Sequence, residues 1–438
     1  MTLPWAALYF IENISNSGPL VFTLKKFFED PMLIGFLTSL NVAFNFMVGV
    51  VTSYMSDRIW TRFGRRKPFL LIGWSGVILS LVLLPLATNG WSLVAIIILY
   101  QLSADIAKPL EPLYNEVIPP AQRGRAAMVR SVVQNLVGLV FFGLLLMQFD
   151  RVYTFEVLGT ALRTNGEAVL YWSAALVILV ALFFLFFCVK ETPPETQRRR
   201  EAFRLRVFFR DLFARRDQAW LYALYITPLI AAPGVDVFRP LLQTEQLGFS
   251  KADVGKAASI GLIVSLLVFY PLAGFLTDRI ARMRLFQLGL IGPAVANLLL
   301  FLYLRYYSDY TLTFSLWIAF GLLTGIFPAC LYVVWGPLIY DYIPTHRFGT
   351  TSAGLSFVGG VTSFLVMNAG GLWINFFTGM FGPRGASKFD YSSVYILQII
   401  GTLTALGITM VFTYHERCGR IQRLGQLEHQ EPDPALRR

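Results

Sequence analysis

The chain alternates between long apolar runs and short charged stretches. Twelve runs are about as long as a helix needs to be to cross the hydrocarbon layer of a membrane. The pattern therefore predicts an all-α membrane protein with twelve transmembrane helices. They are expected at residues 3–22, 33–55, 69–87, 91–115, 128–148, 168–189, 219–243, 253–275, 285–304, 311–337, 350–376 and 391–414.

Composition supports a protein that lies in the lipid bilayer. Of the 438 residues, 55% are hydrophobic and only 14% are charged, whereas a soluble globular chain carries about 25% charged residues. The first apolar run has no basic residues before it and contains Glu12, which is unlike a cleaved signal peptide. We therefore expect a retained first span.

The basic residues are concentrated on one side of the predicted membrane. The even-numbered loops and the C-terminal tail, with their flanking turns, hold 26 Lys and Arg, and the odd-numbered loops hold 9. This asymmetry predicts that both termini are cytoplasmic, in the cytoplasmic membrane of the cell. The net charge of +11 is thus explained by topology, and no nucleic-acid partner is expected.

Motifs for enzyme chemistry and for metal or cofactor binding are not evident. The three cysteines are widely separated without a CxxC pair, and the sequence has no HExxH, GxSxG or GxxxxGK[ST] stretch. We therefore expect a protein that is not an enzyme, with no cofactor and no metal.

Two loop motifs each occur twice in the chain, and the two copies are separated by nearly the same number of residues in both cases. This indicates a duplicated six-helix unit. "SDRI" after span 2 matches "TDRI" after span 8, so that Asp57 corresponds to Asp278, 221 positions later. "EVIPP" after span 4 resembles "DYIPT" after span 10 at an offset of 225. Two pseudo-symmetric bundles of this kind suit a carrier in which one half moves against the other. The predicted units are 1–189, a linker at 190–218, 219–414 and a cytoplasmic tail at 415–438.

The loop after span 2, "DRIWTRFGRRKP", resembles the signature loop of the major facilitator superfamily. The length of this loop resembles that of the corresponding loop in the glycoside, pentoside and hexuronide cation symporters and in the sucrose transporter group. The stretch "KPLEPLYNEVIPPAQRGRA", which includes the loop after span 4, is similar to theirs as well. The resemblance implies a gate that closes the cytoplasmic side, although these basic residues could also act as a topology signal only. The gating residues implied are Asp57, Arg58, Gly64, Arg65, Arg66, Glu116, Arg123, Asp278 and Arg279.

Span 4 contains three ionisable residues at spacings of three. Asp105, Lys108 and Glu111 would lie on neighbouring positions of one helix face, where burial and carboxylate crowding can raise proton affinity. They are our candidates for ion coupling, and a permanent structural salt bridge is the alternative. In the sucrose group this helix carries an arginine, with which Glu111 aligns, so the coupling chemistry is expected to differ.

Ionisable and amide side chains within spans 1, 4 and 7 are candidates for solute binding, because polar groups are costly at membrane depth. Each span also has an alternative explanation that does not involve a solute. The polar residues of span 1 could cap a broken helix, the glutamine of span 4 could form an interhelical hydrogen bond, and the charges of span 7 could neutralise each other. The candidates are Glu12, Asn13, Asn16, Gln101, Asp236, Arg239 and Gln243.

Together these features favour a secondary carrier that imports a small polar solute, a sugar or glycoside, by proton symport. Na⁺ is the alternative coupling cation. A proton-coupled exporter of drugs or metabolites is one alternative. Span 5 has Gly138 and Gly143 but lacks the Gly-Pro motif of the family's exporters. A sensor that does not transport is the second alternative, and the charged residues at membrane depth argue against it.

Overall fold

The structure is a computed structural model that describes residues 2–16, 18–56, 60–118, 123–157, 160–191, 216–306, 313–343, 348–383 and 387–421. Ten helical segments in these residues are long and apolar enough to cross a membrane. The shorter apolar helix at Gly90–Ile106 and the pair of helices at Thr2–Asn16 and Pro19–Lys25 lie at the two remaining predicted spans. The observed helices thus account for all twelve predicted spans.

The first half of the chain is helical apart from one hairpin. Its elements are α1 (Thr2–Asn16), α2 (Pro19–Lys25), α3 (Pro31–Phe44), η1 (Asn45–Gly49), α4 (Val50–Ser56), α5 (Lys67–Leu83), η2 (Leu84–Leu86), α6 (Gly90–Ile106), α7 (Leu110–Val117), α8 (Arg123–Val140), η4 (Phe141–Leu145), η5 (Leu146–Gln148), β1 (Val152–Val157), β2 (Thr160–Asn165) and α9 (Gly166–Cys188).

The regular elements in the described residues of the second half are all helices. Its elements are α11 (Arg216–Ile230), α12 (Val235–Leu241), η6 (Leu242–Gln246), α13 (Lys251–Val264), η7 (Ser265–Phe269), α14 (Tyr270–Arg279), α15 (Arg282–Tyr306), α16 (Phe314–Thr324), α17 (Ile326–Tyr340), α18 (Phe348–Phe381), η9 (Tyr391–Ser393) and α19 (Val394–Arg417). Most of the predicted linker, 192–215, and the tail beyond 421 lie outside the described residues. The proposed unit boundaries therefore stay predictions.

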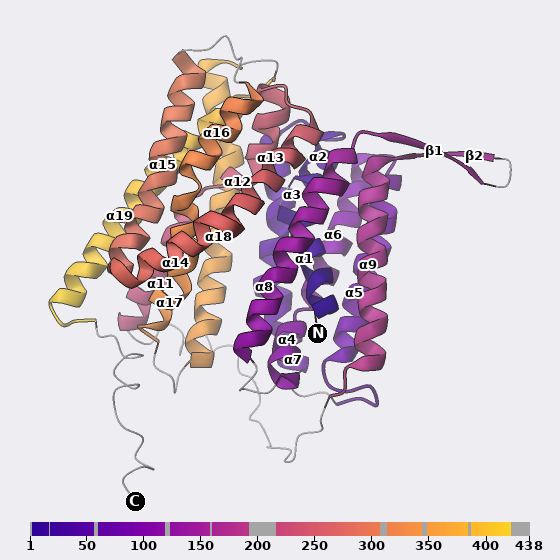
Figure 1. Ribbon diagram of the computed structural model, residues 1–438, viewed down its shortest axis with the longest axis horizontal. Coiled ribbons are helices and arrows are strands. Elements are labelled where there is room, and N and C mark those ends of the chain that lie inside the picture. The colour runs from indigo at the N-terminus through magenta and orange to yellow at the C-terminus, as the bar shows by residue number, and fades with distance from the viewer. Residues whose placement is uncertain are drawn as a thin grey trace, which may run out of the picture.

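The antiparallel hairpin of β1 and β2 replaces what the sequence predicted as a plain loop. Val152 pairs with Asn165 and Val157 with Thr160. Valine, tyrosine, phenylalanine and threonine favour strands, and β1 contains all of these residue types. The hairpin projects sideways beyond α9 (Figure 1). We call the end of the bundle that carries it the hairpin end, and the end that carries residues 60–66 the signature-loop end.

Three of the predicted spans are interrupted by backbone that cannot continue as a regular helix. The break between α1 and α2 contains Gly18 at φ 108°, and the break between α11 and α12 contains Gly234 at φ 66°. Glycine adopts such positive φ values without steric cost. Between α6 and α7 lies Pro109, which lacks the N–H that an α-helix would use. Polar residues of these three spans therefore lie beside irregular backbone.

Wide, π-helical turns interrupt further spans. One is η1 in the second span, and another is η7 in the eighth. Ser265, which begins η7, lies 220 positions after Asn45, which begins η1, close to the offset of 221 between the repeated loops. The turn therefore recurs at corresponding places in the two predicted halves.

The two halves share a hydrophobic core at the hairpin end. One cluster of buried side chains joins first-half residues such as Trp74 to Phe238 and Phe377 of the second half. A separate cluster, which includes Phe286 and Phe412, contains only second-half residues and involves the signature-loop ends of α11, α17 and α19. The halves are thus packed together most extensively at the hairpin end. Figure 1 shows the first half in indigo to magenta beside the second half in rose to yellow.

Candidate functional site

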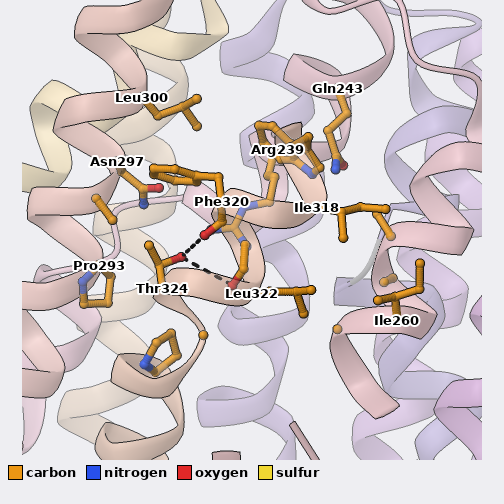
Figure 2. A pocket seen from close by; sticks show the side chains of 18 of the residues that line it. Arg239, Gln243, Ile260, Pro293, Asn297, Leu300, Ile318, Phe320, Leu322 and Thr324 are labelled. Carbon is orange, nitrogen blue, oxygen red and sulfur yellow. Dashed lines mark hydrogen bonds between the residues drawn. The ribbon is translucent and has the colours of Figure 1, made fainter. Parts of the chain in front are cut away.

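A cavity of about 560 Å³ lies among α12, α13, α15 and α16 (Figure 2). Three predicted solute-binding residues, Asp236, Arg239 and Gln243, line it together, and Phe142 of η4 is contributed by the first half. Sites for small molecules commonly have volumes of about 300–1,000 Å³. The cavity is therefore large enough for a small organic solute.

The break before α12 places the charged pair of this cavity. Gly234 ends the interruption in a left-handed conformation, so that Asp236 lies in the first turn of α12 and Arg239 in the last. Residues three apart on a helix lie on one face. The π-helical turn η6 follows at once and contains Gln243, which is buried. Three polar side chains thus face the cavity from one short, interrupted span.

The cavity has a polar wall around Arg239. Its guanidinium lies within electrostatic reach of the Asp236 carboxylate and the Tyr395 hydroxyl, and it lies deep in the protein although much of its surface is accessible from the cavity. Asn297 donates from Nδ2 to Oε1 of Gln398 at 2.8 Å. The buried Tyr395 hydroxyl interacts with the Arg239 guanidinium. A solute that offers hydrogen-bond acceptors could bind to the donors of this wall.

The facing walls are apolar. They include Ile260 of α13 together with Ile318 and Leu322 of α16, as Figure 2 shows. The Thr324 hydroxyl does not add a free polar group, because it donates to the Phe320 carbonyl of its own helix at 2.9 Å. The cavity therefore suits a solute with a polar side and a less polar face.

The other predicted solute-binding residues do not line this cavity. Glu12 is exposed and Asn13 half-buried on α1, whereas the side chain of Asn16 lies outside the described residues. Gln101 is fully buried in α6, and its amide atoms have no hydrogen-bond partner among the described residues. The structure thus brings together the candidates of span 7 only.

Arg130 of α8 forms a polar and aromatic cluster in the first half that the sequence analysis missed. Its Nε donates to the Tyr9 hydroxyl at 2.9 Å, and its guanidinium carbon lies 3.4 Å from the centroid of Trp5. Tyr9 lies within electrostatic reach of Glu12 and of Tyr332 from the second half. The count of basic residues per loop assigns Arg130 to the loop between spans 4 and 5. Its place inside an apolar run was the signal that could have identified it.

The predicted coupling pair of Asp105 and Lys108 is brought together at the break between α6 and α7. Lys108 Nζ lies 3.7 Å from Asp105 Oδ1. Asp105 is 1% exposed, and its backbone carbonyl accepts a hydrogen bond from the Thr52 hydroxyl at 3.3 Å. The side chain of Glu111, the third member, lies outside the described residues. The pair places a carboxylate deep in the first half with a single lysine beside it.

The signature loop is held by Glu191, which follows α9. The Glu191 carboxylate accepts hydrogen bonds from the backbone N–H groups of Arg65 at 2.6 Å, Arg66 at 3.1 Å and Lys67 at 3.0 Å. These groups lie at the start of α5, where unpaired N–H groups and the helix dipole favour an anion. Gly64 has φ 113°, and a Cβ there would lie 2.7 Å from Glu191 Cδ. The glycine therefore allows both the turn and the close approach of the carboxylate.

We expect Glu191→Ala to lower the free energy of unfolding by about 1–2 kcal/mol, the usual cost of a lost helix cap. Glu191→Gln should have an intermediate effect, because its amide retains one acceptor oxygen. Thermal unfolding of the detergent-solubilised protein measures both variants. Equal melting temperatures for the wild type and Glu191→Ala would show that the carboxylate does not stabilise the loop.

The remaining gating candidates are only partly within the described chain. Asp57 and Arg58 lie outside it, as do the side chains of Glu116 and Arg123. Asp278 and Arg279, the expected counterparts of the signature loop, are both exposed at the end of α14. In this region an ion pair joins Arg282 Nη1 to Asp341, with 2.8 Å to each carboxylate oxygen. No pattern in the sequence indicated this pair.

Ion pairs connect the two halves at the hairpin end. Lys25 Nζ lies 3.1 Å from Glu245 Oε2. Lys388 Nζ donates to the carboxylate oxygens of Glu29 at 2.6 and 2.8 Å, and these bonds lower the pKa of Glu29 below its ordinary value. Two further links join Asp150 to Lys251 at 2.6 Å and Asp30 to Asn375 at 2.6 Å. Breaking them would be required for the halves to separate at this end.

The sequence matches the family model of the Major Facilitator Superfamily over residues 6–268 and again over residues 224–418. The chain belongs to the Major Facilitator Superfamily. Proteins of this superfamily are transporters rather than enzymes, and the twelve predicted spans agree with its fold. A comparison with curated proteins finds no match to this superfamily member.

Solved structures of other transporters share the fold of this superfamily member. A POT family transporter in complex with 5-aminolevulinic acid superposes with a TM-score of 0.68 at 13% identity, covering 94% of this chain and 95% of that one. A D-xylose–proton symporter gives 0.64 at 16% identity, with 92% and 95% covered. A bacterial homologue of the human lysosomal transporter Spinster, in an inward-facing and occupied conformation, gives 0.63 at 14% identity, with 95% and 96% covered. At these identities the likeness concerns the fold.

Proposed function

We propose that this transporter imports a sugar or glycoside by cation symport, with a proton as the coupling cation. The observation that supports this most is the cavity in which Arg239, Asp236 and Gln243 face apolar walls. Sugars present many hydroxyl groups on one edge and C–H groups on their ring faces, so they match a site with one polar and one apolar side. A D-xylose–proton symporter is among the transporters of similar fold.

The proton would be taken up at Asp105. Burial of this carboxylate makes its charge costly and favours protonation, whereas the lysine beside it favours the charged form. These opposing effects would allow the group to bind a proton and to release it. Na⁺ is the alternative cation, since carboxylate oxygens also bind it. The cluster of Arg130, Trp5 and Tyr9 would supply solute contacts from the first half.

Orientation follows from the positive charges. With the signature-loop end in the cytoplasm, as the Lys and Arg asymmetry predicts, the ion pairs of the hairpin end form an external gate. Its closure corresponds to an inward-facing state of alternating access. We propose that both termini are cytoplasmic and that the protein lies in the cytoplasmic membrane.

Purified protein in proteoliposomes tests this proposal. A panel of mono- and disaccharides is first screened by thermal shift at two pH values, with and without Na⁺. We expect a sugar to raise the melting temperature and, when added outside the vesicles, to make the external medium more alkaline. If sugar uptake depends on Na⁺ and the external pH does not change, Na⁺ is the coupling cation. Absence of sugar binding, or proton release coupled to drug efflux, would contradict the proposal.

The gate makes a separate prediction. Glu245→Lys places a second positive charge beside Lys25, which should favour separation of the halves at the hairpin end by about 1–2 kcal/mol. A cysteine at Ser39, buried and bonded to Asn368 of the other half at 2.9 Å, should then react with maleimide about tenfold faster in a cysteine-free background. Adding Lys25→Glu should restore slow labelling. If the double variant labels as fast as Glu245→Lys, the pair does not hold the gate.

A further inference from the structure

Two glycines of the cavity wall have open space beside them. Gly261 of α13 and Gly321 of α16 both line the cavity. A Cβ built at either position would meet no atom within 4 Å. By contrast, a Cβ at Gly325, which also lines the cavity, would lie 2.3 Å from the ring of Phe269. Packing thus requires glycine at 325 but not at 261 or 321.

Backbone conformation does not require glycine at these two positions either. Both lie inside regular helices, and neither has a positive φ. A glycine in a helix interior is less favourable than alanine. What the two residues do contribute is space, because they stand among Ile260, Ile318 and Leu322 on the apolar walls.

We propose that Gly261 and Gly321 determine the largest solute that the cavity admits. The proposal rests on the proposed function, and it adds the size and shape of the substrate. A polar group of the solute contacts the wall of Arg239 and Gln243, while its bulkier face occupies the space beside the two glycines. A leucine at either position would place four carbon atoms in that space. The substrate class is therefore a glycoside or other sugar derivative whose apolar substituent faces α13 and α16.

Open space alone does not make a glycine functional, and the chain offers a control for this. Gly407 of α19 is exposed, has open space around a built Cβ, and does not line the cavity. Gly407→Leu adds the same side chain to another membrane helix. Gly321→Ala adds the smallest side chain and should favour the helix, so it tests the effect of volume without threatening folding.

The first measurement does not depend on the identity of the solute. A cysteine replaces Gln243 on the opposite wall, after serine replaces Cys188, Cys330 and Cys418. Labelling rates are compared for methyl and benzyl methanethiosulfonate. We expect Gly261→Leu and Gly321→Leu to slow the benzyl reagent at least tenfold while changing the methyl reagent little, and Gly407→Leu to change neither. An unchanged benzyl rate, or no labelling by either reagent in the parent protein, would overturn the proposal.

The second measurement uses transport by variants that keep Gln243. Uptake is measured for the transported sugar and for its methyl and octyl glycosides. Gly321→Leu should reduce octyl glycoside uptake at least tenfold more than uptake of the free sugar, and Gly321→Ala should have a smaller effect. Equal loss for all three compounds would contradict size selection. If labelling shows the size effect and no sugar is carried, the sugar function fails while the role of the two glycines stands.

Discussion

Replacing Arg239 by glutamine is expected to weaken solute binding about a hundredfold. Arg239 is the cation of the polar wall, and a hydrogen bond from a charged donor contributes about 1.5–3 kcal/mol to binding. A loss of about 2.7 kcal/mol, within this range, lowers the affinity by a factor of 100. The change also leaves Asp236 without its partner. The affinity of Arg239→Lys should lie between those of the wild type and Arg239→Gln, because lysine keeps the charge but loses the planar arrangement of donors.

Equilibrium binding of the sugar found by thermal shift, measured calorimetrically in detergent, checks this expectation. Arg284→Gln is the matched control, since Arg284 is an exposed arginine near the start of α15 and does not line the cavity. Its affinity should equal that of the wild type. An unchanged affinity of Arg239→Gln, with the protein folded, would remove the cavity from the solute pathway.

Asp105→Asn is expected to abolish uphill accumulation while sugar exchange continues. Asparagine has nearly the same shape as aspartate but does not bind a proton in this pH range, so solute movement and proton movement become uncoupled. With an imposed gradient of one pH unit, a carrier that couples one proton accumulates solute up to about tenfold. The variant should reach equal concentrations on both sides.

Two assays of the same proteoliposomes separate the outcomes. Accumulation of sugar is measured under the pH gradient. Exchange of pre-loaded labelled sugar for external sugar is measured without the gradient. Asp253→Asn, in the first turn of α13 and bonded to Ser250 and Lys256, serves as the control and should accumulate sugar normally. Normal accumulation in Asp105→Asn would exclude Asp105 as the coupling group.

The sequence predicted the helices well because the membrane imposes a simple rule. Apolar length alone identifies a span, and all twelve predicted spans are helical in the described residues. The breaks at Gly18, Pro109 and Gly234 were harder to place. An interrupted span keeps the same apolar composition, and whether a glycine or proline interrupts it depends on the neighbouring helices.

Candidate residues were predictable where the partners are close in sequence. Asp105 with Lys108, and Asp236 with Arg239, are three positions apart, so helical spacing brings them together. Glu191 is separated from Arg65 by 126 positions, and no local pattern connects them. Arg130 was missed for a related reason, because its contact with Tyr9 spans 121 positions and its charge was fully explained by topology.

The wide turns differ in whether the other half has a counterpart. Those at 45–49 and 265–269 lie 220 positions apart, at corresponding places in the two halves. Those at 141–145 and 242–246 have no such counterpart, because at the same offset residues 361–365 belong to the continuous helix α18 and residues 22–25 to α2. These two turns contain Phe142 and Gln243, which both line the cavity. A solute in the cavity therefore meets walls at which the pseudo-symmetry of the two halves does not hold.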